Sequence, residues 1–126
     1  MIVGVGTDLI EIVRIETSIQ RFGDQFLNRV FTPGEIAYCT ARKTSAQSFA
    51  ARFAAKEAGS KALGVGLSRG VHWREFEVRR LPGHRPELML HGRAAEIGAA
   101  LGIHRLSLSL THTHELAFAF VVAEGV

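Results

Sequence analysis

The sequence predicts an α+β fold in which an antiparallel sheet packs against an alanine-rich central helix, as one domain spanning residues 1–126. Two patterns indicate this fold. Alanine recurs at helical spacing over residues 47–63, and side chains alternate at strand spacing over 106–111 and 117–122. With 47% hydrophobic and 21% charged residues, the chain has the composition of a folded protein and not of a disordered one.

The N-terminal third of the chain reads as one strand followed by two helices. Residues 1–8, MIVGVGTD, predict a short buried strand. Isoleucines at helical spacing predict a helix over residues 11–21. The stretch TPGE at 32–35 has a hydroxyl N-cap, a proline at the first helical position and a glutamate three residues after the cap, which predict a helix running to about Arg42.

The segment 47–63 predicts the central helix, and the stretch KTSAQS before it reads as a loop. When the helix is projected at about 100° per residue, five alanines fill one arc, and Glu57 and Lys61 lie together on the border of that arc. So small a face lets the helix lie close against a sheet. Lys56 projects away from Lys61 and is assigned no role beyond that of a basic neighbour.

The C-terminal half predicts most of the sheet. Segments 71–80 and 86–92 flank a Gly-His-Arg-Pro turn and read as a hairpin of two strands. A second alanine-rich helix follows over residues 93–102. The stretch RLSLSLTHTHELAFAFVVAE then predicts a strand, a turn and a strand, which complete an antiparallel sheet.

Glu57 and Lys61 stand four residues apart, and two interpretations of them remain open. In the first they form an ordinary exposed ion pair on a helix, worth about 0.3–0.5 kcal/mol. In the second, the alanine arc packs on the sheet and brings them beside Asp8. The two carboxylates then offer hard oxygen ligands to Mg²⁺, and the lysine holds a phosphate. Asp8 also has an alternative role as a helix N-cap.

Other features suggest other classes of function. His112 and His114, in THTH, would suit a zinc hydrolase, but two histidines without a third ligand or a cysteine cluster are a weak zinc signal. A metal-dependent nuclease is disfavoured, because the sequence has no basic and aromatic track for nucleic acid. The net charge of +3 favours acidic or phosphorylated partners, so a non-catalytic module that binds an acidic protein also remains open.

The sequence also indicates a cellular compartment. Cys39 is the only cysteine, so no internal disulfide can form, and a reducing environment is expected. The apolar N-terminus lacks a basic leader and is interrupted by Asp8 and Glu11, so we expect neither a signal peptide nor a membrane span. These observations favour the cytoplasm.

Four stretches, taken together, resemble the holo-acyl-carrier-protein synthase family, the small 4'-phosphopantetheinyl transferases. They are GVGTDLIEIVRI from Gly4, FTPGE from Phe31, RFAAKEAGSKALGVG from Arg52, and LSLTHTHELAFAFVVAE ending at Glu124. The resemblance implies transfer of 4'-phosphopantetheine from coenzyme A to a serine of an apo acyl carrier protein, with release of adenosine 3',5'-bisphosphate. It leaves open whether the carrier serves fatty-acid or polyketide synthesis.

The motif match implies roles for individual residues in this reaction. Asp8 and Glu57 would bind Mg²⁺ against the pyrophosphate, and Lys61 and His112 would contact coenzyme A phosphates. We take Glu57, directly or through metal-bound water, as the general base that accepts the serine proton, with metal-bound water alone as the rival. Further contacts to coenzyme A are expected from Arg52, Gly64 and Pro86, with Arg42 and Lys43 as additional candidates.

The resemblance also implies two protein interfaces. Arg14 matches a family position that meets the acidic recognition helix of the carrier protein, and Arg21, Phe26 and Arg29 extend this expected docking surface. Family members of this length form homotrimers with coenzyme A in clefts between subunits, so we expect the same assembly. At one hairpin the family often has Gly-Lys-Pro, whereas this chain has His84-Arg85-Pro86, which alters the expected contacts there.

Overall fold

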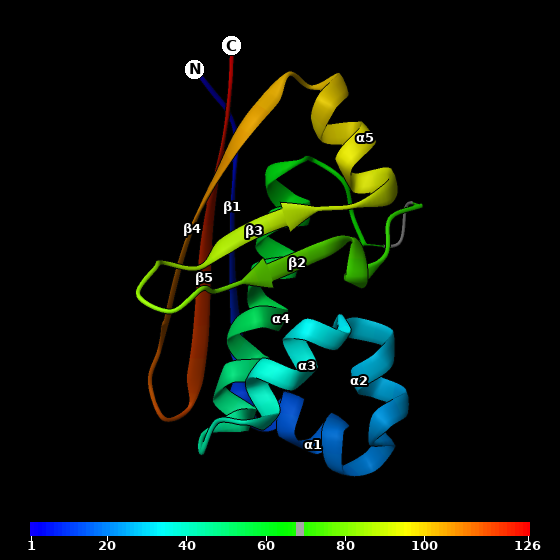
Figure 1. Ribbon diagram of the computed structural model, residues 1–126, viewed down its shortest axis with the longest axis vertical. Helices are drawn as coiled ribbons and strands as arrows, with labels where there is room; N and C mark the ends of the chain where they lie inside the picture. Colours follow the sequence, from blue (N-terminus) through cyan, green and yellow to red (C-terminus); the bar gives the residue numbers. More distant parts are fainter. Residues whose placement is uncertain (68–69) are drawn as a thin grey trace.

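Helix α4 (Ser45–Ala62) lies along one face of a three-stranded antiparallel sheet in this computed structural model, which describes residues 1–67 and 70–126. Strand β5 is the middle strand and pairs with both of its neighbours (Figure 1). The strands, in order across the sheet, are β1 (Ile2–Glu11), β5 (Leu116–Gly125) and β4 (Ile103–His112). The predicted α+β fold with an alanine-rich helix on an antiparallel sheet is therefore confirmed.

Glycines on β1 and alanines on α4 bring these two elements into backbone contact. A Cβ atom at Gly4 would collide with the backbone oxygen of Ala62, and one at Gly6 with the backbone oxygen of Ala58. The alanines of the predicted arc are all buried. Because Asp8 follows Gly6 on the same face of β1, this contact sets how close Asp8 lies to the helix.

The other face of the three-stranded sheet exposes apolar side chains. Val5 is 55% exposed, Leu9 60% and Phe120 38%. The predicted N-terminal strand is confirmed, but it is neither short nor buried, since β1 continues to Glu11 and half of its side chains point away from α4. Apolar residues on an uncovered sheet face cannot be told from core residues by their sequence pattern.

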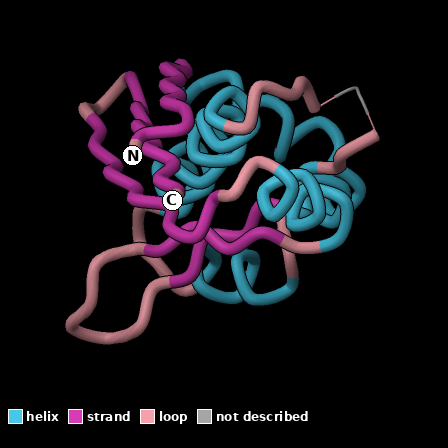
Figure 2. The backbone as a smooth tube through the Cα atoms, turned by 90° about the horizontal axis from the view of Figure 1, so that it is seen from above, coloured by secondary structure: helices cyan, strands magenta, loops and turns pink. Residues whose placement is uncertain are grey.

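A second sheet, of two strands, packs on another side of α4. Strands β2 (Phe76–Arg79) and β3 (Glu87–Leu90) form the predicted hairpin. Gly59 of α4 makes room for them, because a Cβ there would lie 2.8 Å from a methyl carbon of Leu88. The loop between β2 and β3 projects away from the rest of the chain (Figure 2). Helix α5 (Gly92–Ala100) follows β3, as predicted.

Three helices gather at one end of α4 (Figure 1): α1 (Ile12–Phe22), α2 (Asp24–Val30) and α3 (Pro33–Thr40). Helix α3 begins with the predicted capping box, in which Thr32 and Glu35 satisfy each other's backbone N–H groups. Helix α2 was not predicted, because its seven residues are too few to show a helical period. The predicted loop KTSAQS is partly wrong, since α4 already begins at Ser45.

Lys56 is completely buried and joins α4 to α3 and to the second sheet. Its Nζ donates to Glu35 Oε1 over 2.6 Å and to the backbone oxygens of Trp73 and Phe76. Glu35 Oε2 in turn accepts the backbone N–H of Val78. Burial lowers the pKa of Lys56, while the charge of Glu35 opposes this shift. The sequence interpretation of Lys56 as a basic neighbour is therefore wrong, because Lys56 is a buried structural residue.

Among the described residues, no helix combines the length and the hydropathy needed to cross a membrane.

Candidate active site

Asp8 and Glu57 line the same pocket, although one lies on β1 and the other on α4. The pocket encloses about 280 Å³ and also contains Arg14 and Phe26. Burial raises the pKa of the Asp8 carboxyl, and the charges of Lys61 and Arg14 oppose this. Burial also raises the pKa of Glu57, and the negative charge of Asp8 raises it further, whereas Lys61 lowers it. The two carboxylates are thus close enough to disfavour each other's ionisation.

Lys61 reaches back from α4 to β1. Its Nζ lies 2.9 Å from the backbone oxygen of Thr7 and 3.4 Å from Asp8 Oδ1. The described residues contain no ion pair between Lys61 and Glu57, so the ordinary i to i+4 surface pair is not the arrangement in this structure. Asp8 is not a helix N-cap either, because it lies inside β1, and Glu11 occupies the N-cap position of α1. The second interpretation, which groups Lys61 with both carboxylates, therefore agrees with the geometry.

The donor set of this pocket suits a hard divalent cation. Asp8 and Glu57 offer carboxylate oxygens, which Mg²⁺ prefers, and their mutual repulsion would be relieved by a cation between them. Nowhere in residues 1–67 and 70–126 do three or more His, Cys, Asp or Glu side chains gather as a metal site. A metal held by one or two carboxylates keeps its other positions for water and substrate phosphate.

Arg14, from α1, also lines this pocket and brings positive charge to it. A second pocket of about 370 Å³ adjoins the first, shares Ser18 and Phe26 with it, and is also lined by Phe22 and Arg29. Three of the four predicted docking residues, Arg14, Phe26 and Arg29, thus line one continuous surface that leads to the carboxylates. The fourth, Arg21, lines neither pocket, and its guanidinium lies 5.6 Å from the ring centre of Phe22.

His112 lies on the helix-facing side of the sheet but outside the carboxylate pocket. It is the last residue of β4, and the register aligns it with Ala117 on β5 and, across that strand, with Ile10 on β1. Two strand spacings, roughly 10 Å, therefore separate His112 from β1. His112 and His114 are both exposed, and the described part of the chain supplies no third ligand beside them. The zinc-hydrolase alternative has no support in this geometry.

Arg52 is 5% exposed, yet it has no carboxylate partner among the described residues. Its guanidinium carbon lies 4.1 Å from the ring centre of Tyr38, and its buried Nε has no hydrogen-bond acceptor within residues 1–67 and 70–126. Arg42 packs on the same ring, 4.9 Å from its centre. Gly64 follows α4 with a φ of +75°, a left-handed conformation that favours glycine.

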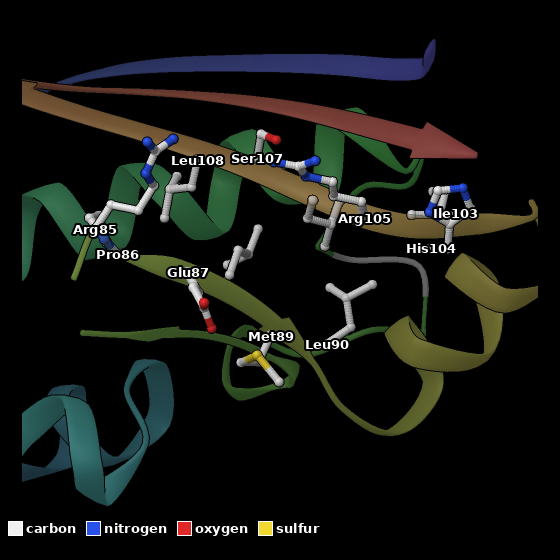
Figure 3. A pocket seen from close by; sticks show the side chains of 12 residues that line it. Arg85, Pro86, Glu87, Met89, Leu90, Ile103, His104, Arg105, Ser107 and Leu108 are labelled. Atoms are coloured by element: carbon white, nitrogen blue, oxygen red, sulfur yellow. The ribbon is translucent and has the colours of Figure 1, made fainter. Parts of the chain in front are cut away.

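Pro86 lines a different pocket from the one that contains Asp8. It encloses about 450 Å³ between β3 and β4, and its walls include Leu90, Leu108 and Arg105 (Figure 3). Arg85 lies at one end of it, next to Pro86. Within one chain, Asp8, Glu57 and Lys61 are therefore gathered with Arg14, Phe26 and Arg29, whereas Pro86 and His112 are not.

A family model matches most of this chain. The model of the 4'-phosphopantetheinyl transferase superfamily matches residues 4–121. This chain belongs to that superfamily. Among the curated relatives of the transferase is a holo-[acyl-carrier-protein] synthase of Koribacter versatilis, 52% identical over 98% of this chain and 99% of the relative. Another, of Methylobacterium sp., is 55% identical over 100% of this chain and 96% of the relative. The resemblance stated from the motifs is confirmed.

Solved structures of such synthases share the fold of this transferase. That of Neisseria meningitidis has a TM-score of 0.88, is 36% identical and covers 98% of this chain and 99% of its own. The structure from Helicobacter pylori, in complex with coenzyme A, has a TM-score of 0.84 at 34% identity, and the match covers 95% of this chain and 99% of that one. The structure from Bacillus anthracis, in complex with CoA (3',5'-ADP), has a TM-score of 0.82 at 36% identity, and the match covers 100% of this chain and 99% of that one.

Sequence reasoning assigned no site role to several residues that shape the pocket of the transferase. Phe53 and Ser18 line it beside the carboxylates, and Phe22 lines the adjoining pocket. The spacing does offer a signal for Phe53, because it stands four residues before Glu57 and must share a side of α4 with it. No such local signal marks Ser18, which reaches the pocket only because α1 packs across α4.

Proposed function

We propose that this protein is a holo-[acyl-carrier-protein] synthase that transfers 4'-phosphopantetheine from coenzyme A to a serine of an apo acyl carrier protein. The observation that supports this most strongly is that Asp8, Glu57 and Arg14 line one pocket and that Lys61 contacts Asp8. The similar synthases of Helicobacter pylori and Bacillus anthracis, whose structures hold coenzyme A or its 3',5'-ADP part, support coenzyme A as the donor.

In this proposal Asp8 and Glu57 hold Mg²⁺, which when bound neutralises charge on the pyrophosphate of coenzyme A. Lys61 binds a phosphate oxygen as a point charge. Glu57, directly or through a water molecule, accepts the proton of the acceptor serine, since a carboxylate beside the docked serine can act as a general base. The serine oxygen forms the new bond to phosphorus, the phosphoanhydride bond breaks, and adenosine 3',5'-bisphosphate leaves with the bonding electrons.

The acceptor protein is proposed to dock on α1 and α2. Arg14 and Arg29 offer positive charge to an acidic helix, and Phe22 and Phe26 offer an apolar surface between them. Because this surface is continuous with the pocket, a docked helix would carry its serine toward Glu57. Such positioning supplies a large part of the rate enhancement in phosphoryl transfer.

We further propose that the protein works as a homotrimer in which a second subunit completes each site. Two features support this. The uncovered face of the three-stranded sheet bears exposed Val5, Leu9 and Phe120, which a neighbouring subunit would bury. In addition, His112 and Pro86, which the family resemblance assigns to coenzyme A, do not line the carboxylate pocket of their own chain, so a second subunit is needed to bring them to it. The coenzyme A contact expected of Arg52 stays a prediction, because this side chain is 5% exposed and packs on Tyr38.

One assay tests the function. The protein is incubated with coenzyme A, Mg²⁺ and several apo carrier proteins, and each carrier is weighed by mass spectrometry, with and without a chelator. We expect a mass gain of one phosphopantetheine group that needs Mg²⁺ and is lost in Glu57→Gln. A stable complex with the carrier but no mass gain under any condition would favour the non-catalytic binding module instead.

A further inference from the structure

Lys61 contacts Asp8 in a way that a purely phosphate-binding role does not explain. Although its side chain is 54% exposed, it folds over β1 and places Nζ on two oxygens, those of Thr7 and of the Asp8 carboxylate. The Asp8 side chain is only 17% exposed, so little of the carboxylate remains open to solvent. An exposed lysine has many rotamers in water, and this one meets the carboxylate of the proposed metal site.

Lys61 and a metal ion compete for the same carboxylate. A Mg²⁺ ligand oxygen lies about 2.0–2.1 Å from the ion, and an ammonium group on that oxygen would be repelled by the ion's double charge. Of the two residues, Lys61 is the one that can move, because its exposed side chain can rotate away from the carboxylate, whereas Asp8 is held in β1. The other cation that acts on Asp8, Arg14, has no hydrogen bond to it among the described residues.

We propose that Lys61 is a resident counter-ion of Asp8, which a divalent metal displaces, and that the displaced ammonium then binds the phosphate of the donor. This inference rests on the proposed function, since it takes Asp8 as a metal ligand. Metal alone then binds weakly, because it must first break the contact between Lys61 and Asp8. When coenzyme A is bound, the contact of the displaced ammonium with its phosphate compensates for that loss. Metal and coenzyme A therefore each strengthen the binding of the other by the same factor.

The lysine content of the chain allows a direct test on the wild-type protein. Its lysines are Lys43, Lys56 and Lys61. Lys43 is exposed and serves as the reference, and Lys56 is fully buried and serves as the unreactive control. Brief labelling with an amine-reactive reagent, read by peptide mass spectrometry, gives the labelling rate of Lys61 relative to that of Lys43. We expect this ratio to rise about two- to five-fold when Mn²⁺ is added alone, and to fall again when coenzyme A follows.

A second measurement compares metal affinities without coenzyme A. We expect Lys61→Met to bind Mn²⁺ about two- to five-fold more tightly than wild type in calorimetry, since the competing cation is gone. Arg14→Gln is the matched control, because it also removes one positive charge near Asp8 but breaks no hydrogen bond to it. Its effect should be clearly smaller. Circular dichroism would check that each variant is folded.

The inference is wrong if Mn²⁺ binds while the labelling of Lys61 stays constant, or if Arg14→Gln tightens binding as much as Lys61→Met. It is also wrong if Mn²⁺ does not bind at all. In each case the carrier assay decides separately on the proposed function, because a metal-dependent mass gain can occur whether or not Lys61 moves.

Discussion

Lys56 and Glu35 form an ion pair, 2.6 Å from Nζ to Oε1, in which both side chains are 0% exposed. Every hydrogen of the ammonium has an acceptor, and the carboxylate accepts backbone N–H groups from Thr32 and Val78 as well. A buried pair of this kind adds little to stability compared with apolar residues of the same shape, but losing one partner leaves an uncompensated charge in the core.

Glu35→Gln should therefore lower the free energy of unfolding by about 3–5 kcal/mol, as measured by urea denaturation. The double variant Glu35→Gln with Lys56→Met removes both charges and should recover part of this loss. If the single variant were as stable as wild type, the pair could not be the buried junction between α3 and α4 that the structure shows.

Gly6→Ala should damage stability and activity together. The added Cβ would meet the backbone oxygen of Ala58, so β1 and α4 must separate, at a cost of about 1–3 kcal/mol or more. Asp8, two residues further along β1, would move away from Glu57. Gly34→Ala is the control, because a Cβ there has an ordinary 3.5 Å contact as its nearest neighbour. We expect the turnover of the control to stay normal, and equal effects of the two substitutions would contradict the close contact.

The stability of the protein should fall more steeply in acid because of Glu77. Burial raises the pKa of Glu77, but hydrogen bonds from His91 and Thr32 and the charge of Arg79 outweigh it and hold the pKa below its ordinary 4.5. A lowered folded pKa means that Glu77 stabilises the fold above pH 4.5 and that this contribution is lost as the pH falls through the folded value.

The measurement is urea unfolding of wild type and Glu77→Gln at a series of pH values below and above the ordinary pKa. The difference in stability between the two proteins should shrink toward low pH. Glu96→Gln is the control, because Glu96 is 69% exposed in its pair with Arg93, and its difference from wild type should stay near zero. If the free energies of unfolding of Glu77→Gln and wild type ran parallel across the whole pH series, the lowered pKa of Glu77 would be refuted.

Arg14→Glu should weaken the binding of the acceptor protein more than the binding of coenzyme A. Reversing the charge beside the pocket should raise the KM for an acidic carrier by about tenfold or more, or roughly 1.4 kcal/mol, while the KM for coenzyme A changes little. Arg93→Glu, on the distant helix α5, reverses an exposed charge of the same kind and should leave both constants unchanged. A larger effect on coenzyme A than on the carrier would place Arg14 in the donor site instead.

Phe120→Asp should break the proposed trimer. Phe120 lies on the uncovered face of the three-stranded sheet, and a charge there could not be buried between subunits. Light scattering should report a monomer, and the transfer activity should fall because each site would lose the residues of its neighbour. Leu101→Asp replaces another exposed apolar residue, 44% exposed at the end of α5, and should keep the wild-type mass.

Much of this fold follows from local patterns in the sequence. The alanine arc of α4 and the capping box of α3 depend on residues close together in the chain, and both were predicted correctly. The same patterns misjudged β1, because the exposure of Val5 and Leu9 depends on what covers the sheet and not on their own spacing. The burial of Lys56 could not be predicted either, since its partner Glu35 is 21 residues away.

Part of the candidate site could likewise be predicted from the sequence, and part of it could not. The spacing of Glu57 and Lys61 predicts that they share one side of a helix, and in the structure Lys61 contacts Asp8 while Glu57 lines the same pocket as Asp8. The contact of Lys61 with the backbone of Thr7 had no signal in the sequence, because any residue supplies a carbonyl oxygen. The roles of His112 and Pro86 stay predictions, since neither reaches the carboxylates within one chain.

The contact of Gly4 and Gly6 with the carbonyl groups of α4 has a consequence for how the site responds to heat. Side chains in a core exchange rotamers as temperature rises, but peptide groups in a strand and a helix have no rotamers to exchange. The spacing between the backbones of Asp8 and Glu57 is held by such peptide groups, so it should survive thermal softening of the core. The two carboxylates would then stay within reach of each other until strand and helix separate, that is, until the whole protein unfolds.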